Sequence, residues 1–286
     1  MREFEGRTAV VTGGASGMGF AFAESFAREG MNIVLADIEE KALREAGPRI
    51  EALGASVLLV QTDVGDELQM DHLAEVTRET FGAAHIVCLN AGVSGGTGPL
   101  QSLSTNDWKW CLGVNLWGIV HGLRSFLGDL IEQNEGHVVI TASIAGLTSY
   151  PNMGPYNVSK HAAVTIAETL FAELSETGSE VGVTCLCPGL VSTNIYDAER
   201  NRPKELTDEE QEEVDPQMRE LMAEAFAGAK PPAEVAELVL AAIVEGRFWV
   251  QTDEFFRAPI RARHSSIEND TDPPGSGNIL LAYAVD

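Results

Sequence analysis

Basic residues are scarce in this sequence of 286 residues. It has 19 lysines and arginines against 43 aspartates and glutamates, which gives a formal net charge of −24. Proteins that bind nucleic acids hold the phosphate backbone with clustered Lys and Arg side chains. The charge balance therefore argues against a nucleic-acid partner, and it favours solubility.

Long apolar runs are missing as well. No segment approaches the roughly 18–20 apolar residues that span a bilayer. The first residues lack the charged and apolar regions of a signal peptide. We therefore predict a cytoplasmic protein with no membrane partner.

Cysteine is rare, and its spacing fits no metal or redox motif. Cys88, Cys111, Cys185 and Cys187 match neither a zinc pattern nor a C-x-x-C pair. The six histidines are scattered, with no partner at ligand spacing. The prediction is buried free thiols, which are common in protein cores, and no metal site.

The hydrophobic residues, 44% of the chain, are enough for one large domain with a substantial core. Short apolar runs alternate with helical segments, which implies right-handed crossovers and a parallel sheet covered on both faces. The predicted fold class is α/β, a Rossmann-like doubly wound parallel sheet in three layers. The predicted strands are 7–13, 31–37, 56–61, 85–90, 137–142, 181–187 and 247–251, and the predicted helices are 14–30, 39–53, 67–81, 105–133, 156–176 and 233–244.

The regular alternation ends after Pro188. Residues 194–230 are polar and strongly acidic, and 206–226 could form one or two short helices. A segment of this length without a strand is more often functional or mobile than structural. From Thr252 the periodic pattern fades. Residues 269–277 are typical of a flexible linker, and the apolar stretch 279–285 could dock on the body or on a neighbouring subunit.

Glycines gather between the first predicted strand and the first predicted helix. Gly13, Gly17 and Gly19 permit a tight turn in which a pyrophosphate approaches backbone N–H groups at a helix N-terminus. Their spacing is G-x-x-x-G-x-G and not G-x-G-x-x-G, so a purely structural turn stays open. The position at the carboxyl end of a strand favours a nucleotide site.

Asp37 ends the second predicted strand, roughly twenty residues after the glycine turn. A carboxylate there would accept hydrogen bonds from ribose hydroxyls and repel a 2′-phosphate. Its neighbours Ala36, Ile38 and Ser16 bring no compensating base. The sequence therefore favours NAD over NADP, although Asp37 could also simply cap the next helix.

Tyr156 and Lys160 lie four residues apart near the start of a predicted helix, so they share one face. An ammonium beside a phenol favours the phenolate and lowers the phenol pKa. The pair is therefore a candidate general acid/base. The spacing alone also fits a solvated helix face, so the assignment depends on the rest of the chain.

Together these motifs resemble the short-chain dehydrogenase/reductase superfamily, in its compact single-domain NAD-binding branch. The resemblance covers about 6–251 and depends on motifs in a fixed order. A looser resemblance, carried by 194–200 and the acidic residues after it, is to bacterial aryl-alcohol Cα-dehydrogenases. The motifs are Thr12 to Gly19, Asp63-Val64, Asn90-Ala91-Gly92, Asn115, Ser143, Tyr156 with Lys160, and Pro188-Gly189 with Thr193.

The resemblance implies four catalytic residues. Tyr156 would exchange a proton with the substrate oxygen, while Lys160 would bind the nicotinamide ribose and lower the phenol pKa. Ser143 would hydrogen-bond the same oxygen, and Asn115 would hold a water that links Lys160 to solvent. A turn-forming serine and an asparagine that bends its helix are the structural alternatives. The implied cofactor-binding residues are Thr12, Gly13, Ser16, Gly17, Met18, Gly19, Asp37, Ile38, Asp63, Val64, Asn90, Ala91, Gly92, Tyr156, Lys160, Pro188, Gly189, Val191 and Thr193.

The implied activity is NAD-dependent hydride transfer. The expected pocket is mainly apolar, which favours a hydrophobic secondary alcohol or its ketone, with cyclic and aromatic ones among the candidates. The basic residues Arg200 and Arg202 are expected at solvated lid positions. A catalytically silent NAD-binding regulatory or scaffold protein is the alternative. The expected lining is Val93, Ser94, Ile144, Ala145, Tyr150, Met153, Leu190, Ile195 and Tyr196.

The resemblance also implies the organisation of the chain. Residues 1–251 would form the NAD-binding Rossmann-fold catalytic domain, with a substrate lid at about 194–230, and 252–286 would be a C-terminal extension. The family's usual assembly implies a homo-oligomer, a tetramer or a dimer, that pairs the helices predicted at 105–133 and 156–176.

Overall fold

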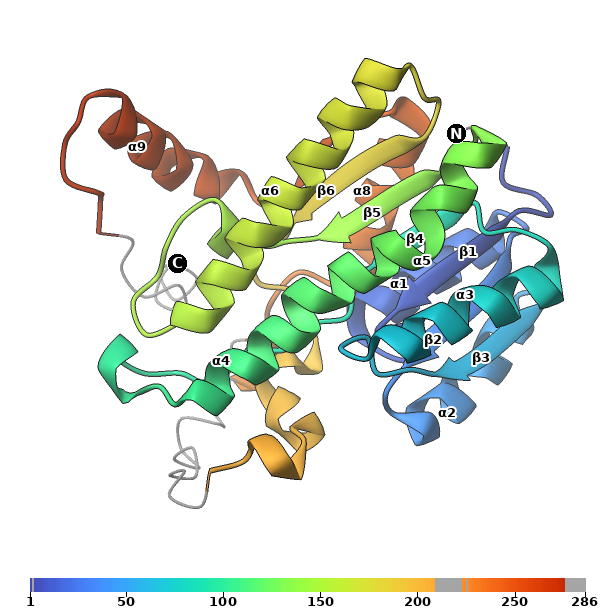
Figure 1. The fold of residues 1–286 in the computed structure, drawn as a ribbon, viewed down its shortest axis with the longest axis horizontal. Helices are drawn as coiled ribbons and strands as arrows, with labels where there is room; N and C mark the ends of the chain where they lie inside the picture. The colour runs from blue at the N-terminus through green and yellow to red at the C-terminus, as the bar shows by residue number, and fades with distance from the viewer. Residues whose placement is uncertain (2, 209–222, 225, 276–286) are drawn as a thin grey trace.

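The computed structural model describes residues 1, 3–208, 223–224 and 226–275 (Figure 1). In this part of the chain, seven parallel strands form one sheet in the order β3-β2-β1-β4-β5-β6-β7. The chain winds outward from β1 in both directions, which confirms the predicted doubly wound sheet. The strands are β1 (Thr8–Thr12), β2 (Asn32–Asp37), β3 (Val57–Gln61), β4 (Ile86–Leu89), β5 (His137–Thr141), β6 (Gly182–Cys187) and β7 (Trp249–Gln251).

Helices cover both faces of the sheet and make three layers (Figure 1). One face packs against α3, α5 and α6, and the other against α1, α2 and α8. Shorter helical turns connect the layers. The bounds are α1 (Gly17–Arg28), α2 (Glu40–Glu51), α3 (Glu67–Phe81), α4 (Thr105–Leu112), α5 (Gly118–Gln133), α6 (Gly154–Thr177), α8 (Pro232–Glu245) and α9 (Arg257–Glu268), with η1 (Leu100–Ser102), η2 (Gly113–Trp117), η3 (Ile144–Gly146), η4 (Asn194–Asn201), η5 (Lys204–Leu206) and η6 (Glu254–Phe256).

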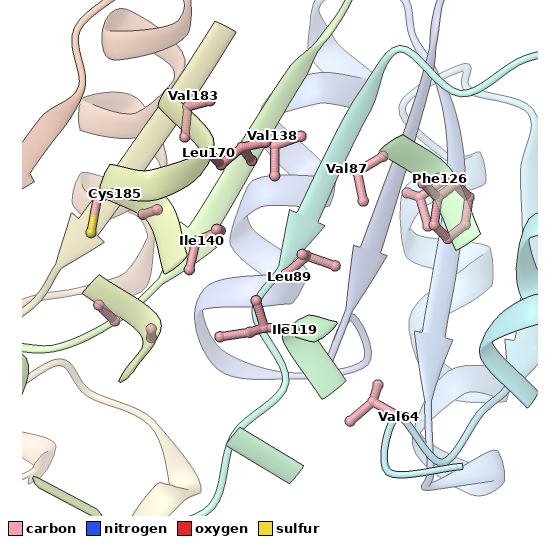
Figure 2. Packing of buried hydrophobic residues seen from close by; sticks show 14 of the residues in the cluster. Val64, Val87, Leu89, Ile119, Phe126, Val138, Ile140, Leu170, Val183 and Cys185 are labelled. Atoms are coloured by element: carbon pink, nitrogen blue, oxygen red, sulfur yellow. The ribbon is translucent and has the colours of Figure 1, made fainter. Parts of the chain in front are cut away.

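The central strands are buried on both faces, as their unbroken apolar runs predict. Side chains of β4, β5 and β6 meet those of α5 and α6 in one core (Figure 2). Gly122 lets α5 approach β4 closely, because a Cβ atom there would lie 2.3 Å from a methyl carbon of Leu89. Burial of each Leu, Ile or Val side chain stabilises the fold by about 1.5–3 kcal/mol. This packing holds the carboxyl ends of the strands in register.

The helix predicted over 105–133 is helical along its whole length, but it is not a uniform α-helix. It consists of α4, the π-helical turn η2 and α5. A π-helical turn inserts an extra residue and changes the direction of the side chains that follow, and such turns often occur at functional sites. Here it contains Asn115.

The prediction that periodic structure fades after Thr252 is wrong for 254–268, which form η6 and α9. Buried Phe256 connects this segment to the core. Most other positions of α9 are exposed, so the helix lacks a strong apolar stripe. None of the described helices is both long and apolar enough to cross a bilayer. Most of the helical prediction at 206–226, and all of the apolar stretch 279–285, lie outside the described residues.

Candidate active site

The turn between β1 and α1 forms a cradle built of backbone. Gly13 and Gly17 have φ angles of +61° and +54°, a region that favours glycine. A Cβ atom on Gly19 would lie 2.1 Å from the carbonyl oxygen of Gly13, so only glycine fits there. Because α1 starts within this turn, its free N–H groups are available to an anionic phosphate. The cradle therefore fits the pyrophosphate of a dinucleotide.

Hydrogen bonds between side chains and backbone join three strand ends below the cradle. The Thr12 hydroxyl accepts hydrogen bonds from the N–H groups of Asn90 and Ala91, at 2.9 and 3.1 Å. The Asn90 amide donates to the Thr12 carbonyl (3.1 Å), and the Thr141 hydroxyl donates to the Asn90 side-chain oxygen (3.1 Å). These residues therefore hold β1, β4 and β5 at a common edge.

Asp37 lies between the glycine turn and the start of α2. One carboxylate oxygen accepts from the N–H of Ala15 (3.0 Å), and the other accepts from the N–H of Glu39 (3.1 Å). Burial raises the pKa of Asp37, and these backbone hydrogen bonds act in the opposite direction. The side chain therefore connects both turns at the place predicted for the adenosine ribose.

Other predicted cofactor residues follow the remaining strands. After β3, the Asp63 carboxylate accepts from the N–H of Gly65 (2.9 Å), and Val64 is buried. After β6, the Pro188 carbonyl accepts from the N–H of Ile144 (2.9 Å). Thr193 touches the glycine turn, because a Cβ atom on Gly17 would lie 3.0 Å from its methyl carbon. The same turns and loops contain Ser16, Ile38, Gly189 and Val191, and Met18 lies in the first turn of α1.

The predicted catalytic pair is on α6, where Lys160 is 3% exposed and its ammonium donates to the Thr141 carbonyl at 2.9 Å. The Lys160 nitrogen is 5.6 Å from the centre of the Tyr156 ring. The Tyr156 hydroxyl is hydrogen-bonded to Ser143, which is buried and also accepts from the N–H of Ala145 at 3.1 Å. The fold thus brings Tyr156, Lys160 and Ser143 together at the carboxyl end of β5.

Burial controls the proton affinity of both members of the pair. It raises the pKa of Tyr156 to about 12, although the hydrogen bond with Ser143 acts in the opposite direction. It lowers the pKa of Lys160 to about 8. The expected lowering of the phenol pKa by Lys160 is therefore not found: burial raises the pKa of Tyr156, and Lys160 is not among the groups that shift it.

Asn115 is 1% exposed and points toward α6 from the π-helical turn. Its amide accepts from the N–H of Val93 (2.8 Å) and donates to the Val93 carbonyl (2.9 Å) and to the Ser159 hydroxyl (3.1 Å). A Cβ atom on Gly92 would lie 3.4 Å from the Asn115 oxygen and 3.6 Å from the Lys160 nitrogen. Asn115 thus positions the loop after β4 against α6, and its role toward a water stays a prediction.

Sequence reasoning missed Ser159. Its hydroxyl donates to the Tyr156 carbonyl (2.8 Å) and accepts from Asn115. Ser159 therefore joins the two helical segments that carry the predicted catalytic residues. A serine three residues after a tyrosine carries no distinctive pattern, so the sequence offered no signal for it.

The expectation that Arg202 is solvated is wrong. Its side chain is 2% exposed and forms an ion pair with Asp107 of α4 at 2.8 Å. Its Nε donates to the Leu206 carbonyl (2.9 Å), and its guanidinium lies 5.2 Å from the centre of the Trp110 ring. Because Asp107 is far earlier in the sequence, local pattern could not reveal this pairing. Arg202 holds the segment after η4 on α4.

The residues predicted to line the pocket divide by burial. Four of these side chains are partly exposed, so a ligand can reach them, and the other five are buried. The buried members are Val93, Ile144, Ala145, Tyr150 and Leu190, and the partly exposed members are Ser94, Met153, Ile195 and Tyr196.

The four cysteines are buried free thiols, as predicted. Cys88, Cys185 and Cys187 pack among apolar core residues, whereas Cys111 lies against the side chains of Asn115 and Ser159. Among the described residues, no three His, Cys, Asp or Glu side chains gather as metal ligands would.

Comparison with known proteins identifies the family of this chain. The family profile described as short chain dehydrogenase matches residues 7–204. A solved short-chain dehydrogenase/reductase from Burkholderia phymatum, in complex with NAD, is 44% identical, with a TM-score of 0.91 over 96% of this chain and 98% of the other. A CLA biosynthesis dehydrogenase/reductase from Lactiplantibacillus plantarum is 31% identical over 96% of this chain and 97% of its own length. A C alpha-dehydrogenase from Sphingobium sp. is 31% identical over 71% of this chain and 66% of its own. The chain therefore belongs to the short-chain dehydrogenase family.

Proposed function

We propose that this protein is an NAD-dependent oxidoreductase that interconverts a hydrophobic secondary alcohol and its ketone, with Tyr156 as the general acid/base. The observation that carries the proposal is the cluster of Tyr156, Ser143 and Lys160 at the carboxyl end of β5. It lies at the same sheet edge as the glycine cradle, which binds the cofactor in the proposal. A proton-transfer group and a hydride carrier at one edge are what alcohol oxidation requires.

NAD is the cofactor in this proposal, and it supplies the hydride acceptor for alcohol oxidation. The cradle of Gly13, Gly17 and Gly19 would hold its pyrophosphate, and Asp37 would accept hydrogen bonds from the adenosine ribose. The NAD complex of the similar Burkholderia phymatum enzyme supports this assignment. Selection against NADP depends on the charges around Asp37.

The chain's own residues would handle the substrate oxygen. Ser143 and Tyr156 would hydrogen-bond the hydroxyl, and Tyr156 would take its proton as the C–H hydride leaves and the carbonyl double bond forms. In ketone reduction the same phenol would return the proton. Since burial disfavours the phenolate, Tyr156 in the resting protein is the neutral phenol, the form that donates the proton in ketone reduction. Alcohol oxidation requires the phenolate instead.

The pocket chemistry supports an apolar substrate. Val93, Trp110 and Ala198 form a small buried cluster beside the loop after β4, with Leu206 packed against it. Arg202 is buried in an ion pair, so it is not available to an anionic substrate group. Aryl alcohols stay among the candidates because of the looser resemblance of residues 194–200 to aryl-alcohol Cα-dehydrogenases, and a C alpha-dehydrogenase is one of the relatives.

The variant Tyr156→Phe tests the function. General acid/base groups contribute about 10²–10⁴-fold to rate, so we expect kcat/KM with secondary alcohols to fall by about that factor. NAD binding, measured by calorimetry, should stay within about twofold, because the phenol oxygen is removed without a charge change. Full activity in this variant would contradict the assignment of Tyr156. If the wild-type protein binds NAD but turns over no alcohol or ketone, the silent regulatory or scaffold protein is the better explanation.

An assembly of identical subunits stays part of the proposal. Trp117, Val158 and Phe171, on neighbouring helical segments, are 52%, 47% and 46% exposed. Exposed apolar side chains of this size on the helices predicted to pair favour an interface between subunits. Light scattering should give the mass of a dimer or tetramer, and a monomer mass would contradict this prediction. The two-part organisation of the chain and its cytoplasmic location stay predictions as well.

A further inference from the structure

Glu39 connects the start of α2 with the lid segment η4. One of its carboxylate oxygens accepts from the Arg200 guanidinium at 2.7 Å and from the Asn201 amide at 2.8 Å. Arg200 and Asn201 follow Glu39 by 161 and 162 residues. The contact therefore brings an arginine from the far half of the chain to the turn that follows β2.

This turn is the place proposed for the adenosine ribose. The N–H of Glu39 donates to the Asp37 carboxylate at 3.1 Å, so the two acidic residues belong to the same turn. The residue before η4, Thr193, lies against Gly17 of the cradle. The segment 193–201 thus contacts the cofactor cradle at one end and the ribose turn at the other.

Arg200 would keep its position without Glu39. Its Nη1 donates to the carbonyls of Asn194 (3.2 Å) and Asp197 (2.8 Å), both within η4, while its Nη2 makes the contact with Glu39. Removal of the Glu39 charge would leave one face of an already positioned guanidinium unpaired. A guanidinium in that state is a good binder of phosphate groups.

We propose that Glu39 is a second determinant of NAD over NADP, acting by holding Arg200 in an ion pair at the rim of the adenosine ribose site. The inference rests on the proposed NAD cofactor. Asp37 repels a 2′-phosphate directly, whereas Glu39 withholds the arginine that would attract one. Two carboxylates thus act against NADP. Asp37 repels the 2′-phosphate, and Glu39 occupies Arg200, which would otherwise pair with that phosphate.

The test is the affinity of purified variants for NAD and NADP, measured by calorimetry without substrate. In Glu39→Gln the side-chain shape is kept and the charge is lost, so Arg200 becomes available to the 2′-phosphate. We expect NADP to bind about five- to tenfold more tightly, the size of one charge-assisted contact at a partly solvated site. NAD affinity should change by less than about twofold. The gain should shrink in high salt, since it is electrostatic.

Two further variants decide whether Arg200 is responsible. Glu39→Gln combined with Arg200→Gln should lose the gain for NADP. Glu40→Gln removes the same charge one residue along, but Glu40 pairs with Arg44 on the exposed surface of α2, so this control should gain nothing. Any of three results would overturn the role of Glu39. The Glu40 variant could gain NADP affinity equally, the gain could survive in the double variant, or Glu39→Gln could lower the affinities for NAD and NADP by the same factor. A wild-type protein that binds neither dinucleotide would overturn the cofactor assignment itself.

Discussion

Two regions border the proposed cofactor site, and they are held in place by different forces. On one side, the turn between β1 and α1 is built of backbone, and a Cβ atom on Gly19 would lie 2.1 Å from the Gly13 carbonyl. On the other side, η4 and the residue after it are held by two arginines, Arg200 on Glu39 and Arg202 on Asp107. Steric fit shapes the first side, and charge positions the second.

The difference predicts different sensitivities. Close packing responds to the volume of a single methyl group but not to salt. An ion pair responds to charge, and the response depends on its burial. Arg202 is 2% exposed, whereas Arg200 is 34% exposed, so the two arginines should themselves behave differently.

The largest effect should come from Gly19→Ala on the steric side. The added methyl group would meet the Gly13 carbonyl, so the turn must shift or open. We expect NAD affinity to fall by more than about a hundredfold, since a displaced turn loses several backbone contacts to phosphate. Calorimetry with NAD measures the loss.

The matched control for this variant is Gly128→Ala in α5, where an added Cβ atom meets nothing within 4 Å. There the change should leave NAD binding intact and stabilise the helix by about 0.5–1 kcal/mol. Tight NAD binding by Gly19→Ala would show that the turn adapts, and the comparison of the two sides would fail.

A smaller effect is expected on the side held by charge. Arg202→Met leaves the Asp107 carboxylate buried without its ion-pair partner. Breaking a buried pair from one side costs about 3–5 kcal/mol, so the free energy of unfolding should fall by that amount in urea titration. Arg200→Met, as the control, removes a pair that is one-third exposed and should cost less than about 1 kcal/mol. Equal losses would mean that burial does not separate the two arginines. Arg202→Met with Asp107→Asn should recover part of the loss.

The steric side was predictable from sequence because its determinants are local. Gly13, Gly17 and Gly19 follow a strand and start a helix, and the structure has the turn where the order of elements places it. Tyr156 and Lys160 were visible for the same reason, since four residues on one helix define their geometry.

The side held by charge was not predictable. Arg200 and Glu39 are 161 residues apart, and a single sequence gives no measure of such a distance in space. The π-helical turn around Asn115 has no compositional signal either, so the sequence predicted the helix over 105–133 but not its local change of hydrogen-bond pattern. The raised pKa of Tyr156 comes mainly from burial, which depends on how the chain folds around the phenol and does not follow from its spacing to Lys160.

Lys160 adds a third case to the comparison, because it is a buried charge on α6 that belongs to neither side. Its ammonium donates to the Thr141 carbonyl, and within the described residues no carboxylate forms an ion pair with it. Burial lowers its pKa from an ordinary 10.5 to about 8. The unfolded chain therefore keeps this proton up to about pH 10.5, while the folded protein releases it from about pH 8.

The sign of the pH dependence follows from this difference. Below pH 8 both states carry the charge, and its burial imposes a constant cost. Between pH 8 and 10 the folded state binds fewer protons than the unfolded state, so stability should rise with pH. Relative to Lys160→Met, we expect the wild-type protein to gain about 2 kcal/mol between pH 7.5 and 9.5, at about 1.4 kcal/mol per pKa unit. Urea titrations of both proteins across this range measure the gain. Parallel stability curves would mean that Lys160 is not buried as a charge. The range stops short of pH 10, because above it the raised pKa of Tyr156 has the opposite effect on stability.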